Sequence, residues 1–265
     1  MTQPTEQLQR NKPDRLREAD NDLVFSYLTM RNLIGISGIL LPIVLYFFTH
    51  RGDEDKRIEP SISDYYYTSH GDVLVVLLSV LGVFLFTYKG YTWIEKALTT
   101  IAAVCAIGIG FSPTATSAAN SLSIHKARET VPQLGPLPVH FIFAATFFIA
   151  VAIISLKFFP KKDKHSLLRI NGKLTQKAKR NRTYKICGWT ILACLTVMIL
   201  YFLVEPAFVK DFPVVLVFES IAIWAFGISW LTKGETLWPD GEHYIKKAYR
   251  QAKATLEQTQ QPVSN

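Results

Sequence analysis

The distribution of apolar residues constrains this chain more than any other feature. Six apolar runs alternate with polar segments through the 265 residues. Each run is roughly 20 residues long, which is enough for one helix to cross the hydrocarbon core of a bilayer, about 30 Å thick. The sequence therefore predicts an all-α polytopic membrane protein, a bundle of six transmembrane helices. The runs lie near 32–50, 72–90, 94–112, 138–158, 184–204 and 212–231.

Lysine and arginine residues predict the orientation of these runs. The two ends of the chain, the turn at 88–96 and the loop at 157–185 together hold 23 of them, and the other three loops hold 6. Loops rich in Lys and Arg stay in the cytoplasm, so both termini are expected inside. The predicted divisions are a cytoplasmic segment over 1–31, a transmembrane domain over 32–231 and a cytoplasmic tail over 232–265, in a multi-pass protein of the plasma membrane.

The basic 157–185 loop predicts one partner and excludes others. It contains a single acid, Asp163, and we expect its lysines and arginines to lie on anionic lipids of the inner leaflet. No aromatic interleaving or reading motif accompanies this charge, which argues against nucleic acid. The sequence also lacks a glycine-rich phosphate loop and a CxxC pair, which argues against nucleotide-driven and redox chemistry. The expected partners are the lipid bilayer and either another membrane protein or a second copy of the chain.

Polar residues collect on the predicted outer side. The stretch 61–72, SISDYYYTSHGD, holds three tyrosines, a histidine and two aspartates, and it leads directly into the second apolar run. Titratable groups from four further regions of the sequence are predicted on the same side. Together they are Asp64, His70, Asp72, His125, His140, Glu205 and Glu219.

Such a cluster predicts chemistry at the membrane surface. Three imidazoles with a carboxylate can hold a zinc ion, whose bound water acquires a pKa near 7 and can attack an ester, amide or phosphate of a lipid. Zinc is therefore the candidate cofactor, although no HExxH or HxxxH motif pairs two ligands on one helix face. The predicted roles are metal ligation by His70, His125 and His140, catalysis by Glu219 and Asp72, and substrate contact by Asp64, Tyr66 and Glu205.

Glu219 is the strongest single-residue signal. A carboxylate within a membrane span is costly and must face the bundle or a wet cavity, usually with a partner. Metal ligation, a proton relay and general-base catalysis all fit this position, and so does a packing hydrogen bond to a hydroxyl such as Ser79 or Thr99. The other candidates also have structural alternatives. A single histidine suits interfacial hydrogen bonding, and Asp72 suits a helix cap.

Five blocks of the sequence carry a resemblance to a known group of proteins. PSISDYYYT, HGDVLVVLLSVLGVFLFTYKGY, VHFIFAATFF, RNRTYKICG and FESIAIWAFGISWLTKGE resemble an uncharacterised family of bacterial six-span integral membrane proteins. The resemblance covers about residues 25–236. It implies the topology of that family and a place in the bacterial inner membrane.

A more distant similarity is to the superfamily of alkaline ceramidases and progestin-receptor-like proteins. Those seven-span hydrolases place a Ser, an Asp and three His residues for zinc among their helices, and the resemblance implies Ser69, His70 and Asp72 as matching positions. This chain differs in having six predicted spans and in lacking two histidines one turn apart on a late helix.

Three classes of function follow from the sequence. The first is a sensor, accessory or interaction protein of the membrane with a polar cluster outside. The second is a membrane-embedded, metal-dependent hydrolase that acts on a lipid-like substrate. The third is a small proton-coupled transporter that uses Glu219, although the two halves of the chain show no inverted repeat.

Overall fold

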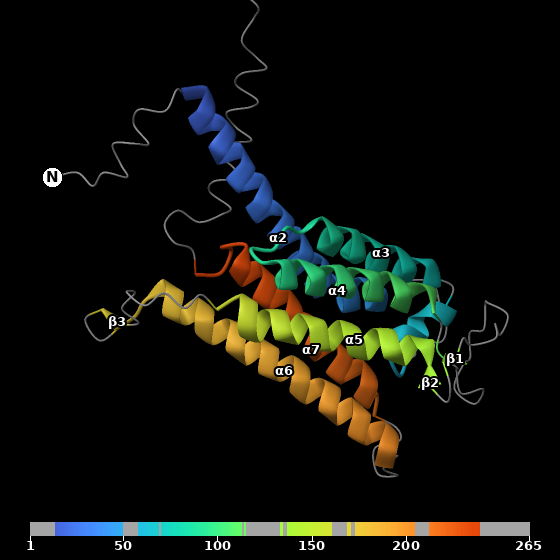
Figure 1. Cartoon of the computed structure of the whole chain (residues 1–265). Coiled ribbons are helices and arrows are strands. Elements are labelled where there is room, and N and C mark those ends of the chain that lie inside the picture. The colour runs from blue at the N-terminus through green and yellow to red at the C-terminus, as the bar shows by residue number, and fades with distance from the viewer. Residues whose placement is uncertain are drawn as a thin grey trace, which may run out of the picture.

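The computed structural model describes residues 14–49, 58–68, 70–112, 114, 133–134, 137–160, 169–170, 173–204 and 212–238. The regular secondary structure of this part of the chain is helical apart from two pairs of two-residue strands (Figure 1). In β1–β2 (Gln133–Leu134 and Leu137–Pro138) and β3–β4 (Arg169–Ile170 and Lys173–Leu174) the strands run antiparallel. The helices are α2 (Asp14–Thr49), η1 (Ser63–Tyr67), α3 (Gly71–Thr87), α4 (Trp93–Phe111), α5 (Val139–Ile153), η2 (Ile154–Phe158), α6 (Gln176–Val204) and α7 (Val214–Lys233).

The predicted apolar runs are helices. Within the described residues, five helical segments are long and apolar enough to cross a membrane, and these are Tyr27–Phe48, Trp93–Phe111, Val139–Phe158, Gln176–Val204 and Val214–Lys233. This confirms the all-helical, membrane-compatible character of the chain. The predicted run at 72–90 is the shorter apolar helix α3 of 17 residues.

The short connection between α3 and α4 explains why α3 ends early. Tyr88 leaves the helical conformation with ψ near 126°, and its N–H bonds to the carbonyl of Leu85. Thr92 then starts α4, because its hydroxyl accepts the N–H of Glu95 at 3.2 Å as an N-cap. The predicted run extends to residue 90, but these backbone contacts end the helix at Thr87.

Two helices begin well before their apolar segments. α2 starts at Asp14, so the predicted boundary between residues 31 and 32 falls inside a continuous helix, and its first half projects beyond the bundle (Figure 1). α6 starts at Gln176, where the hydroxyl of Thr175 accepts the N–H of Ala178. Hydropathy marks the membrane segment, whereas polar and charged residues of good helix propensity extend both helices past it.

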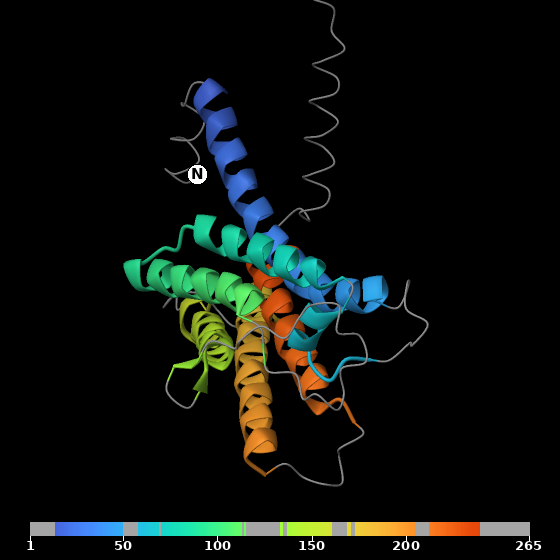
Figure 2. The ribbon, with the colours of Figure 1, turned by 90° about the vertical axis from the view of Figure 1, so that its right-hand side faces the viewer.

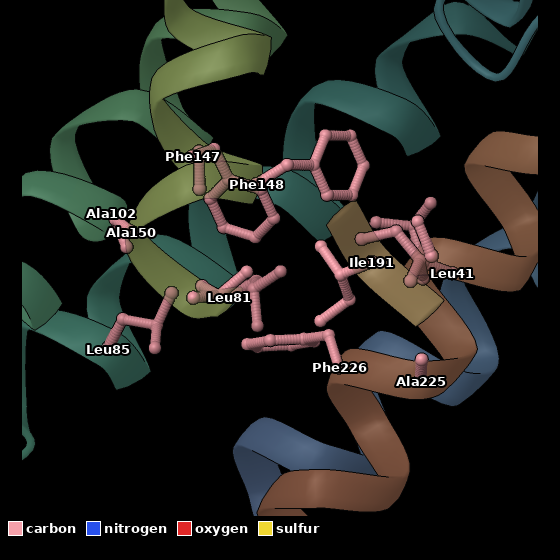
Figure 3. Close-up of a cluster of buried hydrophobic side chains, with 14 of the residues drawn as sticks. Leu41, Leu81, Leu85, Ala102, Phe147, Phe148, Ala150, Ile191, Ala225 and Phe226 are labelled. Atoms are coloured by element: carbon pink, nitrogen blue, oxygen red, sulfur yellow. The ribbon is translucent and has the colours of Figure 1, made fainter. Parts of the chain in front are cut away.

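The six long helices form a ring. Each helix from α2 to α7 packs against the next one in sequence, and α7 returns to contact α2 (Figures 1 and 2). Leu41, Leu81, Phe147, Ile191 and Phe226, from five different helices, fill the interior of this ring (Figure 3). The ring places the ends of distant helices side by side, which brings their polar residues together.

The outer faces of the helices carry many large apolar side chains. Large exposed hydrophobic side chains lie along every long helix, among them Phe47 on α2, Phe86 on α3, Val104 on α4, Ile149 on α5 and Leu203 on α6. A water-soluble protein does not leave so much contiguous apolar surface exposed. These faces belong in lipid, which together with the five long apolar helices identifies a membrane protein.

Candidate functional site

Residues 58–68, which we call the 58–68 loop, close one end of the ring. The N–H of Leu216 on α7 donates to the carbonyl of Pro60 at 2.9 Å, and Figure 2 shows the loop in cyan beside the start of α7. The rings of Tyr65 and Tyr67 are buried, and the Tyr67 hydroxyl donates to the carbonyl of Thr114 beyond α4. Gly71 allows the loop to lie against α3, since a Cβ there would be 2.0 Å from the Tyr66 carbonyl oxygen. Tyrosine burial thus anchors a polar loop on the helix ends.

The loop places Ser63 against His140 at the start of α5. The Ser63 Oγ and His140 Nε2 atoms are 2.8 Å apart, and Nδ1 is 2.7 Å from the carbonyl oxygen of Ser112. A carbonyl oxygen only accepts hydrogen bonds, so Nδ1 of His140 carries the proton. The Nε2 lone pair of the neutral ring then accepts the Ser63 hydroxyl proton. Both side chains are buried, Ser63 being 7% and His140 3% exposed.

The same loop brings two carboxyl groups together. Glu219 Oε2, within α7, accepts the backbone N–H of Ile62 at 2.7 Å. Asp64, two residues later, accepts the hydroxyls of Ser61 at 2.7 Å and of Thr114 at 3.5 Å. The two carboxyl groups are close enough for the charge of Asp64 to act on Glu219. We call Ser61, Ser63, Asp64, Thr114, His140 and Glu219 the His140 cluster.

Burial shifts the titration of two groups of the loop. It raises the pKa of the Asp64 carboxyl above its ordinary value, although hydrogen bonds from Ser61 and Thr114 act in the opposite direction. Burial also raises the pKa of Tyr65 to about 12, and the charge of Glu59 adds to that shift. Tyr65 is therefore a neutral anchor at every ordinary pH, whereas Asp64 holds its proton to a higher pH than an exposed aspartate does.

The remaining predicted site residues lie in several places. His70 precedes α3, and its ring packs against Phe48 of α2 with 6.5 Å between the ring centroids. Asp72 is exposed in the first turn of α3, where the helix dipole favours a negative charge. Tyr66 packs edge-on against Tyr67. His125 and Glu205 lie outside the described residues.

The zinc prediction finds no assembled ligand set in the described part of the chain. No group of three or more His, Cys, Asp or Glu side chains there is arranged to hold a metal ion. Both ring nitrogens of His140 already make hydrogen bonds within the protein, so this ring would have to leave Ser63 or Ser112 to bind a metal. The arrangement around His140 fits proton chemistry without a metal.

A second charged cluster, built around the buried side chains of Arg31 and Glu95, lies at the opposite ends of α4 and α7. Arg31 donates from Nη2 to the Tyr91 hydroxyl at 3.2 Å and from Nη1 to the Lys233 carbonyl at 3.3 Å. Glu95 accepts the Tyr88 hydroxyl and the Tyr91 N–H, both at 2.9 Å. The side chains of Arg31 and Glu95 are only 5% and 1% exposed. These five residues form what we call the Arg31 cluster.

Aromatic rings hold the cations of the Arg31 cluster. The guanidinium carbon of Arg31 lies 4.3 Å from the centroid of the Tyr27 ring, and the Lys233 ammonium lies 4.9 Å from that of Phe159. Phe159 and Tyr88 both pack edge-on against Trp230, which is fully buried. Ring faces attract cations most strongly where water is excluded, so this cluster joins α2, the start of α4 and the end of α7.

Sequence reasoning missed both Ser63 and the Arg31 cluster. Ser63 is one hydroxyl residue among several in its stretch, and nothing in its spacing links it to His140, 77 positions later. The positions of Arg31 and Glu95 in the sequence could have indicated that they lie close together. They border the first and third predicted runs at the same predicted membrane surface, and a base and an acid at equal depth are natural partners.

We compared the chain with protein-family models, with curated proteins and with solved structures, and none of the three comparisons gave a match.

Proposed function

We propose that this chain crosses the bacterial inner membrane six times, with both termini in the cytoplasm and the His140 cluster outside. The five long apolar helices support this threading, and α3 supplies the sixth span, since its 17 residues extend about 26 Å. The excess of Lys and Arg in the termini and in alternate loops supports the orientation. The His140 cluster then faces the exterior, and the Arg31 cluster lies at the cytoplasmic surface.

Within this threading, we propose that the protein is a sensor or interaction subunit that responds to protons outside the membrane. The observation that carries this proposal is the hydrogen bond from Ile62 N–H to Glu219, because it docks an exterior loop on an acid of a membrane helix. Asp64 adds a second carboxyl group to the same loop. The protonation states of Glu219 and Asp64 therefore affect how firmly the 58–68 loop is held against α7.

The direction of the response follows from the electrostatics. A carboxylate charge is costly at membrane depth, and two neighbouring carboxylates also repel each other, whereas the N–H that Ile62 donates to Glu219 favours the charged form. The raised pKa of Asp64 means that the docked loop binds a proton more tightly than the released loop does. Docking is therefore firmest in acid, and it weakens as the pH rises from about 4, where an exposed aspartate titrates, through the raised pKa of docked Asp64.

Hydrogen exchange of the 58–68 loop tests this function. The protection of the Ile62 amide would be measured between pH 5 and 8 in the full-length protein, with intrinsic exchange corrected by an unstructured peptide of the same sequence. We expect protection to fall as the pH rises, by at most about tenfold per pH unit for one proton. Glu219→Gln keeps an acceptor for Ile62 but cannot ionise, so its profile should be flatter.

Asp72→Asn is the matched control, because it removes an exposed carboxyl at the same end of the bundle. Its exchange profile should follow that of the unaltered protein. Protection that does not change with pH, or a Glu219→Gln profile identical to that of the unaltered protein, would show that these carboxyl groups do not govern the loop.

We also propose that anionic lipids contact the basic residues of the 157–185 region. Arg182 and Lys185 are exposed in the first turns of α6, where that helix begins ahead of its apolar part. Near a membrane surface each such residue contributes about 1 kcal/mol of attraction to anionic lipid. Native mass spectrometry should show fewer retained anionic lipids in the Arg182→Gln and Lys185→Gln double variant, and equal retention would refute the proposal.

A further inference from the structure

We propose that Ser63 and His140 are a nucleophile and general base for acyl transfer. Their distance of 2.8 Å is the hydrogen-bonding distance that such a pair requires. The sequence predicts His140 as a metal ligand and gives no role to Ser63. The proposed sensor function uses neither side chain. The proposal concerns this pair alone and does not depend on the carboxyl groups that dock the loop.

The third group of a serine triad is replaced here by a backbone carbonyl. The carbonyl oxygen of Ser112 accepts the Nδ1 proton of His140 at 2.7 Å and thereby fixes the tautomer of the ring. The ring of Phe141 packs edge-on against the imidazole, with 5.9 Å between centroids, and holds its orientation. The lone pair of Nε2 consequently points at a hydroxyl, as in a base that is ready to take a serine proton.

The surroundings indicate a carboxylic ester that carries an acyl chain as the substrate. Phe141 and Phe202 touch each other with 5.4 Å between centroids, and they are 39% and 48% exposed on the lipid side of α5 and α6. A chain lying along these two rings would bring its ester group to the start of α5. Ser63 and His140 lie at that position, at the end of the ring of helices.

The proposed reaction balances with water as the only co-substrate. Ser63 Oγ attacks the ester carbonyl carbon while its proton moves to His140 Nε2. The imidazolium returns that proton to the departing alkoxide, which leaves as an alcohol. Water, deprotonated by Nε2, then attacks the acyl-serine, and the proton passes back to Ser63 Oγ as the carboxylic acid leaves.

An alkyl fluorophosphonate tests the pair, because it phosphonylates only activated serines. The full-length protein in detergent micelles would be treated with the reagent, and its peptides would be mapped by mass spectrometry. We expect one adduct, on Ser63. His140→Gln should slow its formation about 100-fold or more, which is the lower end of the contribution of a general base.

Ser229 provides the matched control. Its hydroxyl is fully buried in the same bundle, but it bonds to Ser155 and not to an imidazole. Ser229 should stay unmodified, and Ser229→Ala should leave the labelling of Ser63 unchanged. Hydrolysis of a p-nitrophenyl acyl ester should disappear in Ser63→Ala.

An unmodified Ser63 in the folded protein overturns the proposal, and so does labelling that proceeds equally fast in His140→Gln. The mapping uses the unaltered chain, so it decides the question even if a variant fails to fold. If Ser63 of the unaltered protein is not labelled while the pH profile of loop exchange is as expected, the nucleophile is rejected and the sensor function stands.

Discussion

The His140 cluster and the Arg31 cluster lie at opposite ends of the ring, and they are built from different kinds of polar group. The His140 cluster is built from two carboxyl groups, an imidazole and hydroxyls, all gathered by one loop. The Arg31 cluster combines cations on aromatic rings with one carboxylate that phenol and backbone donors satisfy. One end contains carboxyl and imidazole groups, which can take up or release a proton, and the other is built around an arginine that stays protonated.

Under the proposed function, this difference separates an end that responds to pH from an end that does not. Burial raises the pKa of the Tyr88 hydroxyl well above its ordinary value, so Tyr88 donates to Glu95 at every physiological pH. Arg31 stays charged under the same conditions. The Arg31 cluster therefore keeps α2, α4 and α7 together whatever the pH, while the 58–68 loop is the part that we propose to respond to pH.

The largest effect is expected from breaking the fixed end. Glu95→Ala leaves the Tyr88 hydroxyl and the Tyr91 N–H without their acceptor and removes the only carboxylate that the described residues place in the Arg31 cluster. A hydrogen bond to a charged group contributes about 1.5–3 kcal/mol, and this change removes two of them. The free energy of unfolding, measured by denaturant titration in micelles, should fall by that amount at every pH from 5 to 8.

Lys96→Ala is the control for this loss, because Lys96 is the exposed neighbour of Glu95 on the same helix turn. A surface change of this kind stays within about 0.5 kcal/mol. Equal effects of the two substitutions would mean that the Arg31 cluster contributes nothing particular to stability.

The next effect concerns the close approach of the 58–68 loop to α3. In Gly71→Ala the new Cβ would lie 2.0 Å from the Tyr66 carbonyl oxygen, so the loop has to move away. Overpacking of this kind costs about 1–3 kcal/mol. Exchange of the loop amides should become faster while α4 and α7 keep their protection near the Arg31 cluster.

Gly110→Ala on α4 is a matched glycine for comparison, because its Cβ would meet Leu78 at an ordinary 3.5 Å. Alanine also favours a helix over glycine by up to about 1 kcal/mol. We expect no loss of stability from this change. A destabilisation as large as that of Gly71→Ala would show that the loop contact is not the cause.

The helices could be predicted from sequence because hydropathy is a local property. Each predicted run coincides with a helix to within a few residues on its apolar side, from Trp93–Phe111 to Val214–Lys233. The polar extensions of α2 and α6 could not be located in this way, since propensity and not hydropathy decides where a helix begins in water.

The sequence indicated several residues of the sites but not their partners, because the sites depend on contacts between distant segments. Asp64, His140 and Glu219 were recognised as candidates, and the fold brings them to the same end of the ring through one loop. Their roles were harder to read, since the partners include backbone groups such as the Ser112 carbonyl and the Ile62 N–H, which the sequence does not mark.

A smaller effect on the free energy of unfolding is expected from Asp64→Asn, and this effect should depend on pH. The pKa of Asp64 is raised on folding, so the folded protein holds this proton to a higher pH than the unfolded chain does. Stability from this group is complete below about pH 4, the unfolded value, and declines as the pH rises through the raised folded value. Asp64→Asn keeps partners for Ser61 and Thr114 and should remove this decline.

The measurement is the free energy of unfolding at several pH values between 5 and 8 for both proteins. The asparagine variant should show a flatter profile, with its gain over the unaltered protein growing as the pH rises through the raised pKa of Asp64. Parallel profiles would mean that Asp64 does not bind its proton more tightly in the folded state.

The smallest effect is expected between the two clusters, at the hydroxyl pair of Ser155 and Ser229. The two oxygens are 2.8 Å apart and fully buried, and Ser155 lies in the π-helical turn η2 at the end of α5. Interhelical hydrogen bonds of this kind contribute about 0.6 kcal/mol on average in membrane proteins. Ser155→Ala should cost about that much at every pH, and the double variant with Ser229→Ala should recover part of it, because no hydroxyl is then left unpaired. If the stability lost in Ser155→Ala instead grew with pH, the Ser155–Ser229 hydrogen bond would be coupled to the His140 cluster. The part of the bundle that responds to pH would then extend closer to the Arg31 cluster.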